Sequence, residues 1–529
     1  MQNMWLKNVI LIILASLLYT LAVPNEIYNY GNLFFGFITL VPLFYVIFTS
    51  SKTRQVMFYS GLFGLISSSF IYFWLLYFED FSIWTLSGVG FAHTLYFVIL
   101  GMFIHTARKK GNLRPFIVTI IWISYEYLKS IGYLGFPWNL LAQSAGIAPF
   151  VQIADITGQW GISFILVLLN AMILETMLVR NKSIIKSWIF TALLFIGSIS
   201  YGIYTNNTGI PWEKTLTVSV IQQNADSWIS GQEMNSIKKG QDLTRAELQK
   251  SKVTPDLIVW SENAFRYPYT ETGLRYTMEP LGDPFTSFLS NVNVPLLVGS
   301  PYMLNRKTMD ALNAVLLISP KGEIMQYYGK NHPVPFAENI PFWNLNIVSS
   351  FFKNVVGINN QGWSIGKPNT IFKIPLSEGT SLSFGTPICF EDSFPYISRE
   401  FIKHGADILI NLSNDSWSKT ISGETQHLAA ARLRAIENRR VLIRSTNAGV
   451  STIIDPWGKM NYTLPLFKSD TFTATIPVYK KENLTVYTKM GNWFPVSLIF
   501  ILIIYLFYDV YIQKRRSIFQ YTPTLNKPI

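Results

Sequence analysis

Long apolar segments crowd the first 205 residues of the chain, and one more lies near the C-terminus. A helix needs about 20 mostly apolar residues to cross a bilayer. The sequence therefore predicts eight membrane-spanning helices, at 5–23, 31–49, 55–77, 83–105, 114–130, 160–179, 187–204 and 492–511. Because seven more such segments follow the first, we interpret the first as a retained anchor and not as a cleaved signal.

Between the seventh and eighth segments the pattern changes to short β-rich runs separated by polar or helical stretches. Strands are expected at 216–222, 257–260, 295–299, 314–318, 382–386, 408–412, 441–445 and 450–454, and helices at 231–251, 395–404 and 424–437. Several runs are apolar throughout, which is typical of strands covered on both faces. Two such sheets with helices outside them predict an α/β sandwich of about 280 residues.

We thus expect a membrane domain at 1–205, a soluble domain at 206–488, and a final membrane helix with a short tail at 489–529. Composition agrees, since only 14% of the residues are charged and 49% are hydrophobic. A soluble globular chain carries about 25% charge. Intrinsic disorder and a disulfide scaffold are excluded, because the chain is strongly apolar and has a single cysteine, Cys389.

The loop charges predict the orientation. The charged residues of loops two, four and six are all basic, namely Lys52, Arg54, Arg108, Lys109, Lys110, Arg114, Arg180, Lys182 and Lys186. Loops one, three and five carry the acids Glu26, Glu79, Asp80 and Asp155. Basic loops stay in the cytoplasm, so we expect both termini there and the soluble domain on the outer side. The net charge of +12 (43 basic minus 31 acidic residues) then reflects topology and lipid headgroups, and nucleic acid is not an expected partner.

One charged pair is expected inside the membrane domain. Glu126 lies in the fifth apolar segment, where an unpaired carboxylate costs about 2.5–3.5 kcal/mol. Lys129 follows three residues later on the same helical face, so we expect the two to pair.

The lone cysteine is the first candidate for chemistry. Cys389 lies in Gly385-Thr-Pro-Ile-Cys389-Phe-Glu391-Asp392, where a β-rich run ends and polar residues follow. A strand-to-turn junction exposes a side chain and turns the next backbone N–H groups toward it, as in a nucleophile elbow. The alternative is an inert, buried apolar cysteine.

Three further polar residues follow predicted strands of the same domain. Glu262 comes just after the run 257–260, and Lys330 comes just after a predicted hairpin at 314–318 and 324–328. Glu338 follows in the proline-rich loop beyond Lys330. Ligands of open α/β sheets gather at such strand ends. Each residue taken alone could equally be a solvated loop residue or a cap.

Glu262, Lys330 and Cys389 together resemble the Glu-Lys-Cys triad of the nitrilase superfamily, which implies a four-layer α-β-β-α sandwich. Further matches in the soluble domain are Asn411-Leu-Ser-Asn414-Asp415-Ser-Trp417, Gln426-His427, and Arg444-Ser-Thr-Asn447-Ala-Gly449. Matches in the membrane domain are Gly135-Phe-Pro-Trp138-Asn139 and Gln152-Ile-Ala-Asp155-Ile-Thr-Gly158. With seven spans before the domain and one after it, the chain resembles the apolipoprotein N-acyltransferase family over nearly its whole length.

The sequence departs from that family's pattern at a few positions. Phe390 stands where a tyrosine is frequent, and the lysine loop has Asn331, Pro333 and Ala337 where we expect arginine, leucine and glycine. These positions concern the walls of the pocket and leave the triad intact.

The resemblance implies transfer of an acyl chain from a phospholipid, with phosphatidylethanolamine as the expected donor, to the N-terminal amine of a diacylglyceryl apolipoprotein. Cys389 would carry the acyl chain as a thioester, and Glu262 would serve as general base. Lys330 and the N–H of Phe390 would stabilise the oxyanion, with Glu338 and Glu391 in support. No cofactor or metal is expected, because the five histidines lack the spacing of paired metal ligands. The implied location is the inner membrane of a bacterium, with the catalytic domain in the periplasm.

Lipid access is expected to involve an unusually apolar stretch at 340–356, which includes Trp343, Phe351 and Phe352. We expect it to dip into the outer leaflet, and the alternative is a buried helix of the sandwich. By its position in the family, Trp228 is expected to line the lipid pocket, and ordinary packing is equally compatible with its sequence context.

Two other functions remain open from the sequence. A membrane-tethered amidase would use the same triad with water as acceptor, but an anchor requires far less membrane sequence than this chain has. A transporter or receptor would be expected to show polar, broken and repeat-related spans. The spans here are aromatic and mostly uncharged.

Overall fold

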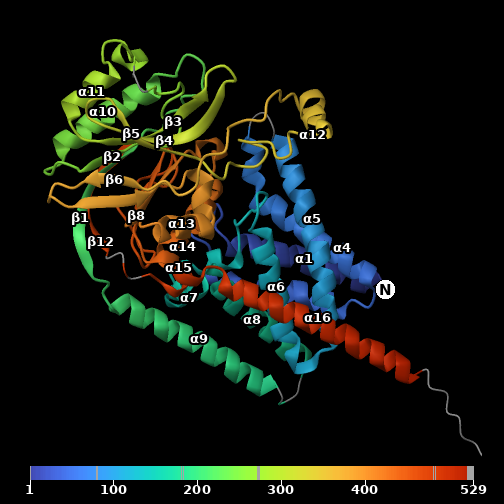
Figure 1. Cartoon of the computed structure of the whole chain (residues 1–529). Helices are drawn as coiled ribbons and strands as arrows, with labels where there is room; N and C mark the ends of the chain where they lie inside the picture. The colour runs from blue at the N-terminus through green and yellow to red at the C-terminus, as the bar shows by residue number, and fades with distance from the viewer. Residues whose placement is uncertain are drawn as a thin grey trace, which may run out of the picture.

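The computed structural model describes residues 2–78, 82–179, 182, 184–270, 274–479, 482 and 484–520 (Figure 1). Glu79, Asp80 and Arg180, which contribute to the predicted topology, lie outside the described residues. The apolar segments form α1 (Gln2–Ala22), α2 (Leu33–Gly36), α3 (Val41–Thr49), α4 (Thr53–Ile71), α5 (Ser82–Thr106), α6 (Arg114–Lys129), α8 (Gln159–Leu178), α9 (Ile184–Asn207) and α16 (Trp493–Gln520). The second predicted segment is divided, and its second helix begins with Pro42 in the first turn, where a proline is tolerated.

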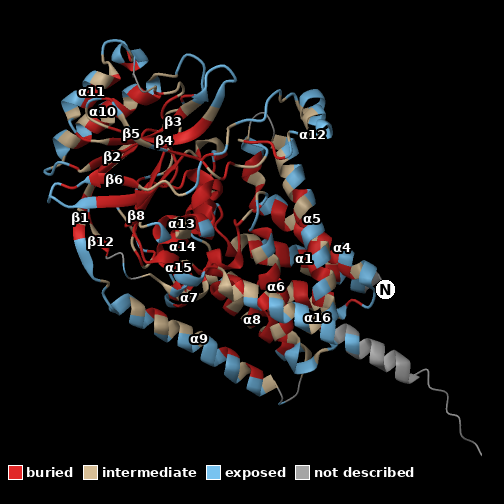
Figure 2. Cartoon of the chain, viewed as in Figure 1, coloured by how far each residue is buried: buried red, intermediate tan, exposed pale blue. Residues whose placement is uncertain are grey.

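Four of the described helices are long and apolar enough to cross a membrane, at Met4–Ala22, Ser82–Lys109, Gln159–Leu178 and Ile184–Asn207. Two shorter apolar helical stretches cover Leu33–Thr49 and Trp493–Tyr508. α9 and α16 run along the outside of the bundle with many exposed side chains (Figure 2). These include Phe190, Leu193, Ile504 and Phe507, which are suited to face lipid. The count of eight spans stays a prediction.

The predicted α/β sandwich is confirmed. The first sheet has the order β12-β1-β2-β3-β4-β5 and the second has the order β11-β10-β9-β8-β7-β6. The strands of the first sheet are β1 (Trp212–Gln222), β2 (Leu257–Val259), β3 (Leu296–Asn305), β4 (Asp310–Ile318), β5 (Ile324–Gly329) and β12 (Asp470–Tyr479). Those of the second are β6 (Phe372–Pro375), β7 (Ser381–Gly385), β8 (Ile408–Ser413), β9 (Leu442–Thr446), β10 (Thr452–Ile454) and β11 (Met460–Asn461).

Helices cover the outer face of each sheet. α10 (Asn235–Lys250) and α11 (Phe285–Val292) lie beside the first sheet, and α13 (Pro395–Lys403) and α14 (Ile421–Asn438) contact the second (Figure 1). β1, β2 and β3 are parallel neighbours, as are β7, β8 and β9. Parallel strands of one sheet end at a common edge, so the loops that follow β7 and β8 lie together. The loop after β2 of the first sheet meets them through the hydrogen bond from the N–H of Asn414 to Glu262.

α14 joins the α/β sandwich to the membrane helices. All but its first residue are buried, and it lies in the interior of the molecule between the second sheet and the bundle (Figure 2). Gln426 accepts a hydrogen bond from Trp74 Nε1 at 2.9 Å and donates to the carbonyl of Pro24 at 3.0 Å. Arg439, just after α14, binds Asp155 with an Nη2 to Oδ2 distance of 2.8 Å. Buried polar groups are tolerated because they are paired, and here the pairs fix the domain on the bundle.

The expected pairing of Glu126 with Lys129 is wrong. Glu126 Oε1 accepts hydrogen bonds from Trp122 Nε1 and the N–H of Leu141, both at 3.0 Å. Lys129 Nζ donates instead to the carbonyl of Trp138 at 3.0 Å. Both side chains thus hold the loop after α6, whose backbone needs partners because it is buried.

Candidate active site

Glu262, Lys330 and Glu338 lie together at the ends of the first sheet. Lys330 directly follows β5, and its Nζ lies 3.4 Å from Glu262 Oε1 and 2.9 Å from Glu338. The lysine side chain is only 1% exposed, so its ammonium group is removed from water. A buried ammonium requires opposite charge, which the two carboxylates supply.

An asparagine that the sequence did not single out connects the two acids. Asn313 on β4 donates from Nδ2 to Glu262 at 2.8 Å and to Glu338 at 3.0 Å. The other oxygen of Glu262 accepts from the N–H of Asn414 at 2.8 Å. Because each carboxylate is held by several donors, both are fixed in position relative to Lys330.

Cys389 lies in the turn after β7, as expected. It begins a short 3₁₀ helix (Cys389–Ser393) and has a φ of 49°. A side chain other than glycine rarely adopts this left-handed conformation, and such strain concentrates at functional sites. The thiol is buried, and its charged neighbours include Glu262, Lys330 and Asp415.

The charges around Cys389 fix its protonation state. Burial raises the pKa of the Cys389 thiol well above its ordinary value, Glu262 raises it further, and Lys330 lowers it. Burial also raises the pKa of Glu262, against the opposing effect of Lys330. Burial lowers the pKa of Lys330, but the two carboxylates outweigh it and leave that pKa well above its ordinary value. The resting site therefore holds a neutral thiol beside an ammonium, and needs a base to form the thiolate.

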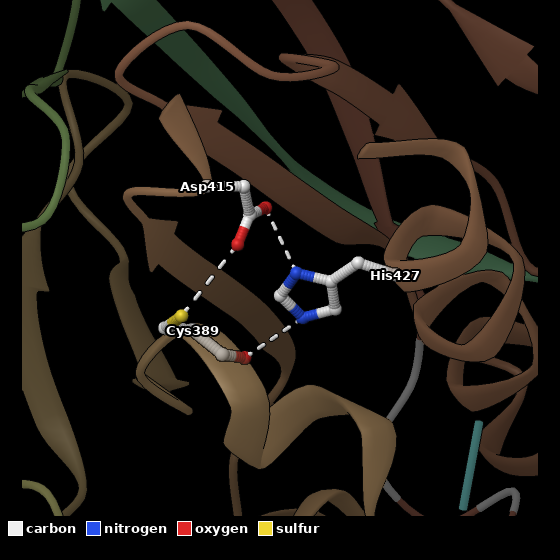
Figure 3. Close-up of side chains that lie close together, drawn as sticks. All are labelled: Cys389, Asp415 and His427. Atoms are coloured by element: carbon white, nitrogen blue, oxygen red, sulfur yellow. Dashed lines mark hydrogen bonds and ion pairs between the residues drawn. The ribbon is translucent and has the colours of Figure 1, made fainter. Parts of the chain in front are cut away.

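A second ionic cluster also adjoins Cys389, and Figure 3 shows two of its members, Asp415 and His427. The thiol points to Asp415 Oδ1 at 3.7 Å, and Asp415 Oδ2 lies 2.8 Å from His427 Nδ1. His427 Nε2 lies 2.8 Å from Asp392 Oδ1 and 3.2 Å from the carbonyl of Cys389. Arg444 binds Asp392, and its Nη2 lies 3.6 Å from Asp415 Oδ2. The sequence matched segments containing these residues but gave them no role.

His427 is the cation of this cluster. Burial lowers its pKa, but Asp415 and Asp392 outweigh that effect and raise the pKa to about 9. With a carboxylate at each ring nitrogen, the imidazolium donates both of its protons. Cys389, Asp415 and His427 form the one group of described residues whose ligand-type atoms are close enough to hold a metal ion. The donor set fits a metal poorly, because both ring nitrogens of His427 are already committed to carboxylates.

Glu391 connects the cysteine turn to the lysine loop. Its Oε2 accepts from the N–H of Ile388 at 2.7 Å. Its Oε1 accepts from Tyr328 Oη at 2.9 Å and from the N–H groups of Asn331 and His332 at 2.7 and 2.9 Å. Glu391 thus supports the geometry of both loops, and its hydrogen bonds to the described residues do not include one to the thiol.

Phe390 connects the site to the membrane domain. Its ring lies 6.0 Å from the ring of Trp138 and 6.2 Å from that of Phe136, measured between centroids. Trp138 also stacks on His427 with a centroid distance of 5.1 Å and donates to Ser393 Oγ at 2.7 Å. The loop after α6 therefore forms one wall of the site.

The expected lipid-access residues lie in two places outside this cluster. Phe351 ends α12 (Asn346–Phe351), and Phe352 begins the π-helical turn after it. No residue of α12 is buried, so the alternative of a buried helix is wrong. Trp343 precedes α12 and lies beneath Lys353. Trp228 is 41% exposed, and the guanidinium of Arg266 stacks over it, with Arg266 Cζ 3.6 Å from the centroid of the Trp228 ring.

An apolar pocket of about 330 Å³ opens at α12. It is lined by Phe336, Pro341, Phe342, Ile347, Val348, Phe351 and Phe352. Figure 1 shows α12 projecting beside one end of α5, away from the helices that cover the first sheet. We call residues 336–356 the apolar arm.

Comparison with known proteins identifies the class first. Residues 217–481 match the family model of the carbon-nitrogen hydrolases, so the sandwich belongs to that class. Residues 15–172 match the N-terminal domain of apolipoprotein N-acyltransferases. The chain belongs to the apolipoprotein N-acyltransferase family.

Relatives with this name align over almost the full length. Apolipoprotein N-acyltransferase 2 of Treponema denticola is 37% identical, over 96% of this chain and 98% of the relative. Apolipoprotein N-acyltransferase 2 of Treponema pallidum is 34% identical, over 90% of this chain and 91% of the relative. The apolipoprotein N-acyltransferase of Borreliella burgdorferi is 31% identical, over 91% of each chain.

The thiol pKa gives a test of the site's electrostatics. We expect alkylation of Cys389 by iodoacetamide to follow a pH midpoint well above that of an ordinary thiol in the wild type. Glu262→Gln removes a negative neighbour that raises the pKa of Cys389, so the midpoint should fall and more thiolate should be present at a given pH. The midpoint of the rate-pH profile is the measurement. Glu323→Gln, at an exposed acid of the same domain, should leave it unchanged, and an unchanged or raised midpoint in Glu262→Gln would contradict the assigned electrostatics.

Proposed function

We propose that this chain transfers an acyl chain from a phospholipid to the N-terminal amine of a diacylglyceryl-cysteine lipoprotein. The observation that carries the proposal is the free Cys389 in a strained turn beside Glu262 and Lys330, in a domain fixed onto apolar helices. The names of the full-length relatives support it.

In the first step Cys389 attacks the ester carbonyl of the phospholipid while Glu262 takes the thiol proton. Lys330 remains protonated throughout, because Glu262 and Glu338 hold its pKa high. Its ammonium and the N–H of Phe390 stabilise the oxyanion, where one such donor contributes about 2.7–4 kcal/mol to the barrier. Glu262 then gives its proton to the leaving lysophospholipid, and the acyl chain stays on Cys389 as a thioester.

In the second step the amine of the lipoprotein attacks the thioester carbon. Glu262 takes the proton from nitrogen, the C–S bond breaks, and Cys389 returns to its resting form. Glu338 orients Lys330 in both steps through their 2.9 Å contact, and Glu391 holds the two loops together. Substrates bind in turn, which predicts ping-pong kinetics.

We place the protein in the inner membrane of a bacterium with both termini in the cytoplasm, from the charges of its loops. The domain at 206–488 then faces the periplasm, where lipoprotein amines and outer-leaflet phospholipids, such as phosphatidylethanolamine, are available. The chain then has a membrane domain at 1–205 and, at 489–529, a final membrane helix with a short cytoplasmic tail.

The apolar arm supplies the route for acyl chains in this account. Ile347 is 81% exposed and Phe342 is 63% exposed. Exposing such apolar side chains to water is unfavourable, and insertion of the arm into lipid would remove that cost. Trp343 and Lys353 are suited to the headgroup level, where aromatic and basic side chains concentrate. Trp228 is assigned to the wall of the lipid site near Glu262.

An amidase that uses water as acceptor is the second candidate function. The residues around the triad would support it, because they activate a thiol in the same way. The membrane helices, the apolar arm and the names of the relatives favour the acyltransferase.

Loading of the enzyme tests the proposal. Purified protein incubated with acyl-labelled phosphatidylethanolamine should form a hydroxylamine-sensitive adduct, and a diacylated lipopeptide should discharge it. Cys389→Ala should give no adduct, and Lys330→Met should load about 10²–10³-fold more slowly because it lacks an oxyanion donor. Discharge by water alone would favour the amidase, and loading of Cys389→Ala would contradict the nucleophile.

The apolar arm generates a separate expectation. Phe351→Asp combined with Phe352→Asp should slow loading from phospholipid vesicles at least about tenfold, because each charge opposes insertion into lipid. Loading from a short-chain ester soluble in water should stay close to the wild-type rate.

A matched control is Met278→Asp combined with Leu281→Asp. These side chains are more exposed than Phe351 and Phe352 and lie in the loop before α11, on the opposite side of the domain from α12 (Figure 1). This variant should load normally from vesicles. Wild-type loading by the arm variant would contradict the role of the arm.

A further inference from the structure

Asp415 is the residue of the second ionic cluster that hydrogen-bonds to the thiol of Cys389 (Figure 3). Its Oδ1 accepts the thiol proton of Cys389 at 3.7 Å. Its Oδ2 is occupied by His427 Nδ1 at 2.8 Å, with Arg444 at 3.6 Å. Only about 4% of the side chain is exposed. The two oxygens of this buried carboxylate therefore have different partners, and only Oδ1 faces the nucleophile.

The charge on Asp415 is maintained by its surroundings. Burial raises its pKa, but His427 and Arg444 outweigh this effect and leave the pKa below its ordinary value. His427 is itself held as a cation between Asp415 and Asp392. An anion is thus present at the sulfur throughout the cycle, and it is too weak a base to replace Glu262.

Acylation changes the hydrogen bonding of Asp415. When Cys389 becomes a thioester, the thiol proton is gone and Oδ1 loses this hydrogen bond. A buried carboxylate oxygen that loses a donor is destabilised, so the acyl-enzyme favours a ligand that supplies an N–H at this point. The vacancy adjoins the sulfur, and hence the acyl carbon that the second substrate must reach.

We propose that Asp415 Oδ1 is the binding site for the α-ammonium group of the acceptor, and that acylation of Cys389 opens this site. The inference rests on the proposed function and names the acceptor contact of the same site. An N-terminal amine has a pKa of about 7.7–8.0 and is mostly a cation at neutral pH. A carboxylate binds such a cation through a charge-assisted hydrogen bond of about 2.7–2.9 Å.

The proton balance is complete with the residues present. The bound ammonium first gives one proton to Glu262, which releases it to solvent. The resulting amine attacks the acyl carbon, the N–C bond forms, and the C–S bond breaks. The second proton passes from nitrogen through Glu262 to sulfur, and the regenerated thiol again donates to Asp415 Oδ1. Release of the amide product is thereby coupled to closure of the acceptor site.

This arrangement favours an amine over water as the acceptor. Water is neutral and gains little from the Asp415 carboxylate, whereas an ammonium gains a charge-assisted bond beside the reacting carbon. In the free enzyme the thiol occupies Asp415 Oδ1, so the acceptor amine binds there only after the thioester has formed. The free enzyme therefore does not form a stable complex with lipoprotein at this site.

Asp415→Asn tests the proposal in single turnovers. The asparagine keeps the shape and a hydrogen-bond acceptor for the thiol, so loading from labelled phosphatidylethanolamine should stay within about threefold of wild type. Discharge by a diacylated lipopeptide should slow by about tenfold to a hundredfold, because the charge that binds the ammonium is lost. Discharge by hydroxylamine, a small uncharged nucleophile, should change little.

Asp392→Asn is the matched control. It removes a buried carboxylate from the same His427 and Arg444 cluster but leaves Asp415 at the sulfur. Because Asp392 supports the charge on His427, this variant should lose some of the lipopeptide discharge, but several-fold less than Asp415→Asn. Equal loss in both variants, or wild-type discharge by Asp415→Asn, would overturn the proposal. If the wild type does not load at all, the proposed function fails instead.

A measurement on the wild-type enzyme removes the dependence on variant folding. A lipopeptide with an N-terminal dimethylamino group keeps the positive charge, and its N-acetylated counterpart is neutral. The dimethylated form should inhibit discharge of the loaded enzyme at least about tenfold more strongly. Equal inhibition by the two would overturn the proposal.

Discussion

The active site depends on keeping one ammonium group charged inside the protein. Lys330 is almost fully buried, and such a charge is tolerated only when opposite charges and hydrogen bonds compensate for lost water. Glu262 and Glu338 provide the charges, and Asn313 holds the two acids together. This cluster requires the ends of β2 and β5 and the start of β4, which is antiparallel to β5, to meet at a common edge. The fold of the sandwich therefore determines the site.

The membrane domain is part of the same site. Trp138, in the loop after α6, contacts both Phe390 and the His427 ring. Gln426 and Arg439 fasten α14 and its end to the loops of the bundle. Cys389 therefore lies between the sandwich and the loops of the bundle. In this account the acyl donor arrives along the apolar arm, and the bundle provides one wall of the site that the acceptor approaches.

Much of this could be predicted from the sequence, for identifiable reasons. Strands that are buried on both faces appear in the sequence as continuous apolar runs. Polar residues directly after such runs, such as Glu262 and Lys330, are expected at the same edge of the sheet. Asn313 could not be found in this way, because it lies inside a strand whose neighbours are apolar. The sequence picked out Asp415 and His427 only as members of segments that match the family. Their roles could not be predicted, because the local sequence does not show that α14 and the loop after β8 meet beside Cys389. The Glu126 and Lys129 pair was wrong because buried loop backbone competed for both side chains. The number of membrane spans and the roles of the site residues remain predictions.

The central claim is that Cys389, and no other residue, carries the acyl chain between donor and acceptor. Peptide mapping by mass spectrometry of the wild-type enzyme, after exposure to phospholipid and rapid acid quench, tests this most directly. The account predicts one fatty-acyl mass increment, on the peptide that contains Cys389, which disappears when diacylated lipopeptide is added before the quench. An increment on any other residue, or transfer to lipopeptide without an acylated Cys389 peptide, would contradict it.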